Sequence, residues 1–365
     1  MNVQTREKRL NEGKAVFYAS VGKISKELKI FYNPIMKLNR DISILLLNSL
    51  NKSNLQIADV LAGSGIRAVR FAKELKKGKI KYIHANDNNS SAFKIIKKNI
   101  NLNKIKNIKA SCLDANDFLL KSPGFDYIDI DPFGSPNPFL NSAVVRLARD
   151  GILAVTATDT SALAGSYELA CRRKYWSKPL KNELMHEIGI RILIRKVQLI
   201  GAQFEKALIP IFTHVSDHYY RVYFRCKKSK HEIDELLKQN LYLLYCKKCL
   251  NIKISHYNEG VCCKKKMVWA GPLWTGRLWD SKLVFKMLKN ADSNESIKLL
   301  DLILKESKIN TVGFVDVHKL FQVNKKKLKK NDKIIKNIKS KGFKAAVTHL
   351  KLTGIRTDIP VKRII

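Results

Sequence analysis

Between residues 55 and 225, short apolar runs alternate with longer stretches whose apolar positions recur at helical spacing. This pattern predicts strands at 55–62, 80–87, 108–117, 125–133 and 151–159, and helices at 66–77 and 91–103. Strands that alternate with helices connect through right-handed crossovers, so we expect an α/β fold whose mostly parallel sheet is covered on both faces. A helix at 183–203 follows, and strands at 206–216 and 219–226 are typical of an antiparallel hairpin at the sheet edge.

The pattern changes near residue 226, where we expect a boundary between a first domain, 1–225, and a smaller C-terminal domain, 226–365. Residues 227–240 are typical of a linker or an exposed helix. The lysine-rich segment 324–344 keeps enough Ile and Leu to predict a helix rather than a low-complexity tail.

The charge of the chain points to a polyanionic partner. Its 69 Lys and Arg residues exceed its 31 Asp and Glu residues, which gives a formal charge of +38. Self-repulsion on this scale disfavours the compact state, so we expect nucleic acid as the partner rather than a membrane. A lysine-rich surface that reflects codon usage alone is the alternative. No segment indicates an obligate protein partner.

Membrane insertion and secretion find no support in the sequence. No apolar run approaches the roughly 18 residues that span a bilayer, and the first residues lack the apolar core of a signal peptide. The seven cysteines are an odd number, and four of them fall within residues 246–263. We therefore expect a cytoplasmic protein with a local metal site rather than a secreted disulfide scaffold.

Three predicted strands end in features of a nucleoside-cofactor site. Gly63 and Gly65 lie where the first strand turns into a helix, which lets a ligand approach the backbone. Asp87 ends the second strand and is placed to accept hydrogen bonds from ribose hydroxyls. Asp114 ends the third strand, with Ala115 beside it, suitably placed for an adenine edge. A dinucleotide and S-adenosylmethionine both fit the glycine turn, so the choice between them depends on the later strands.

The fourth strand ends in Asp131-Pro132-Phe133-Gly134. The exocyclic amine of a base is a poor nucleophile, because its lone pair is delocalised into the ring. Acceptors at Asp131 and at the carbonyl of Pro132 would hold both N–H bonds and turn that lone pair toward a methyl donor. Phe133 offers a ring on which an unpaired base can stack, and Gly134 lets the chain turn away. An ordinary proline turn is the alternative for the tetrapeptide taken alone.

Six segments together resemble the archaeal and eukaryotic tRNA (guanine-26-N2) dimethyltransferase family. They are "FYNPIMKLNRDIS", "AGSGIRAVR", "DIDPFGSPNPFL", "ATDTSALAG", "AGPLWTGRLWD" and "THLKLTGIRTDIP". The resemblance implies a class I, Rossmann-like methyltransferase sheet with an α+β C-terminal domain that binds tRNA. It also implies an enzyme that uses S-adenosylmethionine to dimethylate N2 of guanine 26 in tRNA. An N6-adenine or other exocyclic-amine methyltransferase, or a basic RNA-binding protein with a vestigial site, is the alternative.

The same resemblance assigns roles to residues of this chain. It makes Asp131 the catalytic acid, Phe133 the stacking aromatic and Phe31 the second wall of the base pocket. The residues that it implies contact the methyl donor are Arg40, Arg67, Asp87, Asp114 and Ala115.

The cysteine cluster begins with Cys246 and Cys249, a half-site for tetrahedral zinc. Family members carry a second Cys-x2-Cys pair, whereas this chain has adjacent Cys262 and Cys263. We expect these four cysteines to hold a structural zinc ion, with His256 as an alternative fourth ligand. Free or disulfide-bonded cysteines are the other interpretation.

Overall fold

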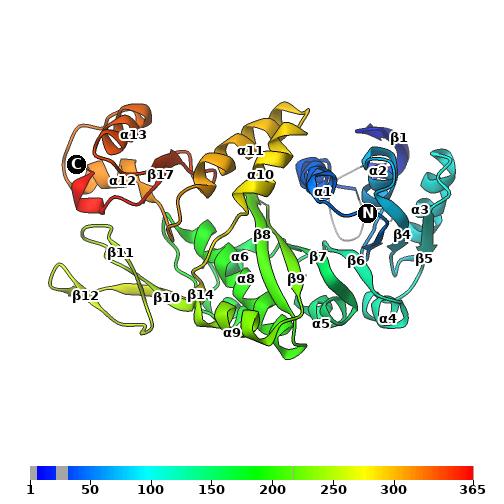
Figure 1. The fold of residues 1–365 in the computed structure, drawn as a ribbon, viewed down its shortest axis with the longest axis horizontal. Helices are drawn as coiled ribbons and strands as arrows, with labels where there is room; N and C mark the ends of the chain where they lie inside the picture. Colours follow the sequence, from blue (N-terminus) through cyan, green and yellow to red (C-terminus); the bar gives the residue numbers. More distant parts are fainter. Residues whose placement is uncertain (1–5, 22–31, 217, 365) are drawn as a thin grey trace. The chain divides into compact units, whose positions relative to one another are not determined.

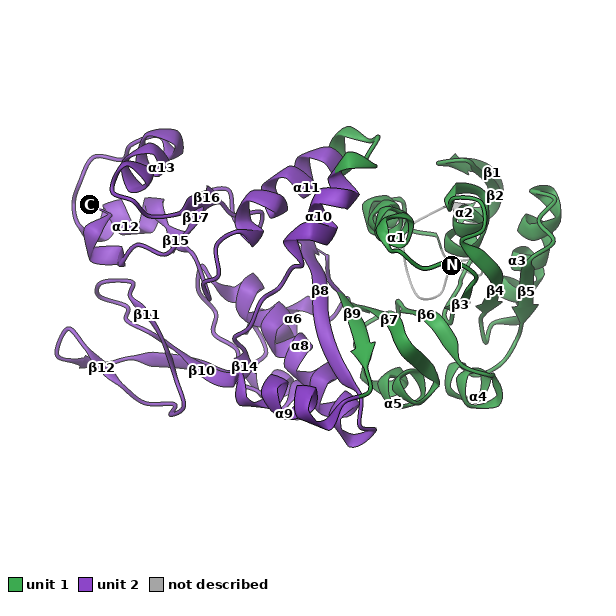
Figure 2. Cartoon of the chain, in the orientation of Figure 1, with its two compact units in different colours: residues 1–157, 223–228, 289–296 green, residues 158–222, 229–288, 297–365 purple. Residues whose placement is uncertain are grey.

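A computed structural model describes residues 6–21, 32–216 and 218–364, and the chain divides into two compact units (Figure 2). Unit 1 comprises residues 1–157, 223–228 and 289–296, and unit 2 comprises residues 158–222, 229–288 and 297–365. The boundary expected near residue 226 falls within strand β9 (Tyr219–Lys227). The two units interleave along the sequence.

A seven-stranded sheet in the order β5-β4-β3-β6-β7-β9-β8 confirms the α/β prediction (Figure 1). Strand β3 pairs in parallel with β4 and β6, β4 with β5, and β6 with β7. Strand β8 stands at the edge, where the sequence predicts the hairpin. Besides β9, the strands are β3 (Leu55–Asp59), β4 (Ile80–Asn86), β5 (Ile108–Ser111), β6 (Phe125–Ile130), β7 (Leu147–Ala157) and β8 (Ala207–Ser216).

Helices cover both faces of the sheet in unit 1. Helices α1 and α2 lie on one face and α4 and α5 on the other (Figure 1). The hairpin of β1 and β2 packs against α2 and α3. The bounds of these elements are β1 (Arg6–Glu12), β2 (Ala15–Val21), a 3-10 turn (Pro34–Met36), α1 (Lys37–Ser49), α2 (Ile66–Glu74), α3 (Ser90–Leu102), α4 (Ala115–Lys121) and α5 (Asn137–Arg146).

The central strands β3 and β6 form the core of unit 1. Ile57 and Ile128 are fully buried, because a strand with helices on both faces must be apolar on both of its sides. Two buried acids interrupt this pattern, Asp59 at the end of β3 and Asp129 near the end of β6. The two are paired across the sheet, so the polar groups gather at its carboxyl edge.

Unit 2 contains two small antiparallel sheets, ordered β11-β10-β14 and β15-β17-β16, and a long helix, α8, that contacts β14. The region beyond residue 228 is thus α+β, as predicted. Its helices, with those just before it, are α6 (Thr160–Leu163), α7 (Glu168–Tyr175), α8 (Met185–Gln203), α9 (Lys230–Lys238), α10 (Ser281–Lys289), α11 (Asn294–Ser307), α12 (Val317–Val323), α13 (Asn331–Ser340) and a 3-10 turn (Val361–Arg363). Its strands are β10 (Asn240–Tyr245), β11 (Ile252–Ser255), β12 (Val261–Cys262), β13 (Lys265–Lys266), β14 (Val268–Trp274), β15 (Val315–Asp316), β16 (Ala345–Val347) and β17 (Gly354–Thr357).

Two sequence predictions are wrong in detail. Strand β5 ends at Ser111, so Asp114 does not end a strand. It caps α4 instead, because an Asp side chain satisfies backbone N–H groups that the first helical turn leaves without partners. The lysine-rich segment is helical only from Asn331, where α13 begins, and Lys325 has a left-handed backbone with φ of 51°.

Among the described residues, no helix combines the length and the apolar character that crossing a bilayer requires.

Candidate active site at the carboxyl edge of the sheet

The turn from β3 into α2 is built on two left-handed glycines. Gly63 has φ of 54° and Gly65 has φ of 75°, a region in which a side chain on Cβ is strained. A Cβ on Gly65 would also lie 3.1 Å from Ile96. Gly65 precedes Ile66, the first residue of α2, so the turn brings an uncrowded backbone to the start of a helix. That arrangement suits the approach of a nucleoside ligand.

Asp87 lies directly after β4 and faces the same turn. Its Oδ2 accepts a hydrogen bond from the backbone N–H of Gly63 at 2.8 Å, and its Oδ1 accepts one from Asn89 at 3.0 Å. Burial raises the pKa of Asp87, and these two backbone hydrogen bonds act in the opposite direction. Each carboxylate oxygen has a second lone pair, so the side chain keeps acceptor capacity for a ribose hydroxyl.

Arg67 connects the glycine turn to the end of β6. The guanidinium of this buried residue forms an ion pair with Asp131 and lies 3.5 Å from Oδ2 of Asp129. It also donates to Oδ1 of Asn39 at 3.0 Å and to Oγ of Ser43 at 3.1 Å, both on α1. Helix α1 therefore fixes the arginine that in turn orients Asp131.

The edge carries more acid than this arginine neutralises. Asp59, Asp87, Asp129 and Asp131 gather around it, and Asp59 and Asp129 are buried. The pKa of Asp59 is raised to about 7, mainly by burial, which outweighs the opposing charge of Arg67, and also by the charges of the other three carboxylates. Oδ2 of Asp59 is buried with no hydrogen-bond partner among the described residues. The site therefore favours a ligand that brings positive charge.

In the tetrapeptide after β6, Asp131 is held by an ion pair and Phe133 is exposed. Asp131 is partly exposed and pairs with Arg67, and Pro132 is buried. Phe133 is 44% exposed. Gly134 has φ of 85° and open space where its Cβ would stand. The structure thus brings Asp131, Arg67 and the glycine turn together and leaves the Phe133 ring accessible.

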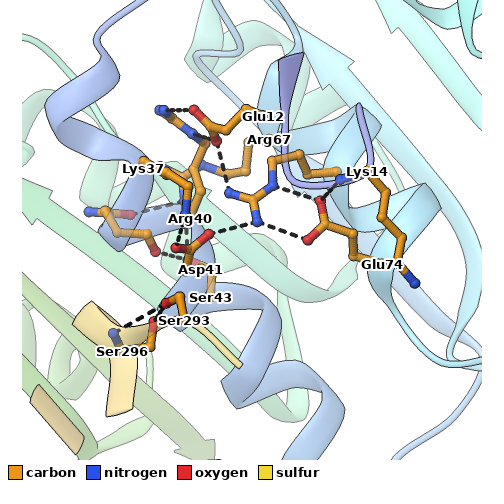
Figure 3. A network of polar contacts seen from close by, with 12 residues as sticks. Glu12, Lys14, Lys37, Arg40, Asp41, Ser43, Arg67, Glu74, Ser293 and Ser296 are labelled. Atoms are coloured by element: carbon orange, nitrogen blue, oxygen red, sulfur yellow. Dashed lines mark hydrogen bonds and ion pairs between the residues drawn. The ribbon is translucent and has the colours of Figure 1, made fainter. Parts of the chain in front are cut away.

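Arg40 pairs with an acid of the β1 hairpin, within the network of polar contacts drawn in Figure 3. Its Nε donates to Glu12 at 2.6 Å, and Glu12 also accepts from Arg70 at 2.8 Å. Arg70 pairs further with Asp41 and Glu74, each at 2.7 Å. Although burial acts to raise it, the two arginines lower the pKa of Glu12 to about 2. In this structure Arg40 joins the β1 hairpin to α1, and its contact with the methyl donor stays a prediction.

The remaining predicted site residues differ in their placement. Oδ1 of Asp114 accepts from the backbone N–H groups of Asn116 at 2.8 Å and Asp117 at 3.2 Å, which is the N-cap arrangement. Ala115 is buried beside it as the first residue of α4. Phe31 lies outside the described residues.

Sequence reasoning missed the residues that surround Arg67. Asp129 accepts from the hydroxyl of Tyr127 at 2.6 Å and lies between the buried Ile128 and Ile130. An acid between two apolar residues of a central strand is a visible signal, because an unpaired buried charge is costly. Asn39 and Ser43 gave no comparable signal, since both sit in an ordinary amphipathic helix.

The four cysteines of the second candidate site come together in unit 2. The sulfur atoms of Cys246, Cys249, Cys262 and Cys263 all lie within 4.8 Å of one another. Sγ of Cys262 is 3.5 Å from that of Cys249 and 3.9 Å from that of Cys263. Four sulfurs bound tetrahedrally at about 2.3 Å from zinc lie about 3.8 Å apart, so the cluster fits this ion. His256 is exposed and is not part of the described cluster.

A tight hairpin explains how adjacent cysteines reach the same point. Cys262 pairs with Lys265 across β12 and β13, and the two residues between them have φ of 53° and 59°. Two successive left-handed residues form the turn that matches the twist of a two-residue hairpin. Although burial raises it, backbone N–H groups of Cys249 and Lys248 lower the pKa of Cys246 to about 7. The local backbone therefore favours a thiolate.

Comparison with known proteins gives concordant matches over nearly the whole chain. The profile of the family described as N2,N2-dimethylguanosine tRNA methyltransferase matches residues 6–365. The chain is 40% identical over 358 residues to the tRNA (guanine(26)-N(2))-dimethyltransferase of Methanobrevibacter smithii, an alignment covering 94% of this chain and 92% of the relative. It is 38% identical over 358 residues to the tRNA (guanine(26)-N(2)/guanine(27)-N(2))-dimethyltransferase of Aquifex aeolicus, covering 93% and 90%.

A solved structure agrees with these matches. The complex of Trm1 from Pyrococcus horikoshii with S-adenosyl-L-methionine resembles this structure with a TM-score of 0.87. The two chains are 33% identical, and the alignment covers 98% of each.

The raised pKa of Asp59 predicts a specific dependence of stability on pH. The folded chain holds a proton on Asp59 up to about pH 7, whereas the unfolded chain releases it near 3.8. The free energy of unfolding therefore loses a contribution as the pH rises through this window, at about 1.4 kcal/mol per unit of pKa shift. We expect Asp59→Asn to flatten that fall between pH 5 and 7.5, measured by urea denaturation of the purified protein.

The control for this measurement is Asp292→Asn, which removes the same charge from an exposed position of unit 1. It should leave the slope of stability against pH as in the wild type. Parallel slopes for wild type and Asp59→Asn would contradict the assignment of the buried proton to Asp59.

Proposed function

The chain belongs to the N2,N2-dimethylguanosine tRNA methyltransferase family, and from this premise we propose that it transfers methyl groups from S-adenosylmethionine to N2 of guanine 26 in tRNA. The observation that carries the proposal is the position of Asp131, which an ion pair with Arg67 holds beside the glycine turn. A carboxylate there lies next to a nucleoside site and at the start of a segment with an exposed aromatic ring.

The residues at the sheet edge suit this methyl donor. S-adenosylmethionine carries a sulfonium and an ammonium against a single carboxylate, so its net positive charge complements the surplus of buried acid. The donor's nucleoside suits the glycine turn and Asp87, which retains acceptor capacity. When bound, the donor supplies an electrophilic methyl group on its sulfonium. The residues proposed to hold it are Arg40, Arg67, Asp87, Asp114 and Ala115.

Asp131 orients the amine that receives the methyl group. Its Oδ2 is paired with Arg67, which leaves Oδ1 as the oxygen that accepts an N–H of the base. The carbonyl of Pro132 accepts the second N–H, and the fixed ring of the proline sets its direction. Holding both N–H bonds turns the lone pair of N2 away from conjugation with the purine ring. Asp131 also receives the proton that the amine loses after each transfer.

Phe133 positions the base itself. A guanine inside a folded tRNA must leave its stack before its amine can reach a buried donor. The ring of Phe133, 44% exposed next to Asp131, provides a face on which the displaced base stacks. Phe31 is proposed as the opposite wall of this pocket.

The positive charge of the chain supports tRNA as the substrate. Phosphate contacts with Lys and Arg supply most of the sequence-independent affinity for nucleic acid. The exposed lysines at 325–330 and in α13 are proposed to make such contacts from the C-terminal domain. A tRNA substrate also leads us to propose that the enzyme acts in the cytoplasm.

The cysteine cluster is proposed to hold a structural zinc ion. All four ligands are protein sulfurs, so no coordination position is left for a substrate. Cys246, Cys249, Cys262 and Cys263 would tie the loop after β10 to the short hairpin of β12 and β13. Little apolar burial stabilises this segment, because Cys246 and Met267 are among its few buried side chains.

The proposed activity is tested by analysing nucleosides of an unmodified tRNA transcript incubated with the protein and S-adenosylmethionine. We expect N2,N2-dimethylguanosine, detected by mass spectrometry, at position 26. A transcript with adenine at that position is the control and should gain no methyl group there. Methyladenosine as the product would favour the rival enzyme class instead.

Asp131→Asn should affect the rate of methyl transfer, whereas Asp87→Asn should affect the affinity for the methyl donor. Asp131→Asn is expected to lower the rate of methyl transfer by at least about 100-fold, since it disrupts amine orientation and proton removal. Calorimetry should show its affinity for S-adenosylmethionine nearly unchanged. Asp87→Asn should weaken donor binding on the order of 10- to 100-fold, because a charged acceptor becomes a neutral one. If Asp131→Asn loses donor binding together with activity, its proposed role is wrong.

Metal analysis of the purified protein is expected to find one zinc per chain. Cys249→Ser should lose the metal and lower the melting temperature by roughly 5 to 10 °C, because metal binding contributes directly to folding. The turnover rate at a temperature where the variant stays folded should change little. Cys112→Ser, at an exposed cysteine outside the cluster, is the matched control. The zinc site would be contradicted if the wild type contained no metal and Cys249→Ser melted at the wild-type temperature. The cysteines would then be free or disulfide-bonded.

A further inference from the structure

Helix α7 of unit 2 ends in a group of basic and aromatic side chains that the proposed reaction does not use. Arg172, Arg173 and Lys174 occupy its last turn, and Trp176 follows immediately. Earlier on the same segment, Tyr167 is 66% and Leu169 is 69% exposed. Some of this charge is neutralised locally, since Arg172 pairs with Glu168 and Lys174 with Asp159.

The conformation of Trp176 is not one that helix capping alone would select. Its φ of 55° lies in the left-handed region, where glycine is the usual residue at the end of a helix. A bulky side chain there carries a conformational cost. The ring nevertheless remains 48% exposed, so burial repays only part of that cost.

Contacts within unit 2 hold the backbone around Trp176 in place. Arg195 donates to the backbone carbonyl of Trp176 at 3.2 Å. The next residues are fixed to β14, where Lys178 and Gly271 exchange backbone hydrogen bonds of 2.9 and 2.8 Å. Trp176 is therefore presented on ordered backbone, which reduces the entropy lost when a partner binds.

Cations lie over the indole rings of Trp176 and Trp269. The ammonium of Lys196 lies over the ring of Trp176. Nζ of Lys178 lies 4.3 Å from the centre of the Trp269 ring, and the guanidinium of Arg172 lies 5.8 Å from it. Burial and the charge of Arg195 lower the pKa of Lys196 to about 8. An approaching anion would relieve this concentration of positive charge.

We propose that this surface, made of Arg172, Arg173, Trp176, Lys178 and Trp269, binds RNA. The basic groups neutralise phosphates, and Trp176 stacks on an unpaired base. Rings combined with cations in this way are typical of single-stranded nucleic-acid sites. An acidic polypeptide would use the charges but has no need of an exposed indole. The proposal rests on tRNA being the substrate and adds a contact surface in unit 2.

The test measures binding of the full-length protein to an unmodified tRNA transcript at several salt concentrations. Trp176→Ala should weaken binding by about 5- to 100-fold, the range for loss of one stacked base. Trp176→Phe keeps a ring and should retain most of the affinity. Arg173→Ala should reduce the slope of log affinity against log salt by about 0.7 to 0.9, as expected for one phosphate contact.

Three controls distinguish loss of RNA contacts at this surface from unfolding, from loss of donor binding and from a general loss of positive charge. Lys305→Ala removes a charge that Asp301 already pairs on α11, and its salt slope should change less. Affinity for S-adenosylmethionine and melting temperature should stay as in the wild type for every variant. Heparin, a polyanion without bases, should bind Trp176→Ala as well as the wild type and Arg173→Ala more weakly.

The outcomes also distinguish the surface from the activity. If Trp176→Ala and Arg173→Ala both bind tRNA with the affinity and salt slope of the wild type, this surface does not bind RNA. That conclusion holds whether or not the protein methylates tRNA. Equal losses of heparin and tRNA binding in Trp176→Ala overturn the stacking role and favour a partner recognised by charge. If the variants lose tRNA binding as expected and the wild type makes no N2,N2-dimethylguanosine, only the proposed activity fails.

Discussion

The ion pair of Arg67 with Asp131 offsets part of the repulsion between the acids at the carboxyl edge of the sheet. Parallel strands all end at the same edge, so the acids that follow β3, β4 and β6 are forced together. Such a cluster repels itself, and burial of Asp59 increases its cost. A guanidinium offers several donors in a fixed plane, and Arg67 uses them on Asp131 and α1 at once. The side chain that orients Asp131 is thereby fixed by the packing of α1.

Another buried ionic network, away from the sheet edge, pairs each of its acids with an arginine. In unit 2, Arg356 of β17 pairs with Glu187 of α8 at 2.7 Å and with Glu306 of α11 at 2.9 Å, and Glu187 also pairs with Arg191. Two acids and two arginines balance, so this network joins three elements without a surplus of charge. Such pairs contribute less to net stability than to fixing which elements meet, because their desolvation offsets the attraction. The sheet edge differs from this network in keeping an excess of acid.

The sequence predicts the sheet well because its information is local. Apolar runs and helical spacing place β3, β4 and β6, and glycines at 63 and 65 mark the turn that the structure shows. The prediction for Asp114 failed by a few residues, since an acid after a strand and an acid before a helix look alike. Motif resemblance supplied Arg40, but pairing with Glu12 across 28 positions has no local signature.

The distribution of charge on the chain favours different places for two ligands of opposite charge, the polyanionic RNA and the cationic methyl donor. In the Glu12 network three acids pair with Arg40, Arg70 and Lys37. In the Arg356 network two acids pair with two arginines, so neither network consumes the formal charge of +38 and most of it remains at the surface. A polyanionic RNA is attracted to that surface over a distance set by ionic strength. The same field would repel a small cationic donor from most of the chain. The surplus of carboxylates around Arg67 reverses the sign of the charge locally, so the proposed donor site would offer a small cation a favourable position inside a basic protein. In its proposed role at this border, Asp131 would bring the amine of the polyanion and the methyl group of the cation to one carboxylate.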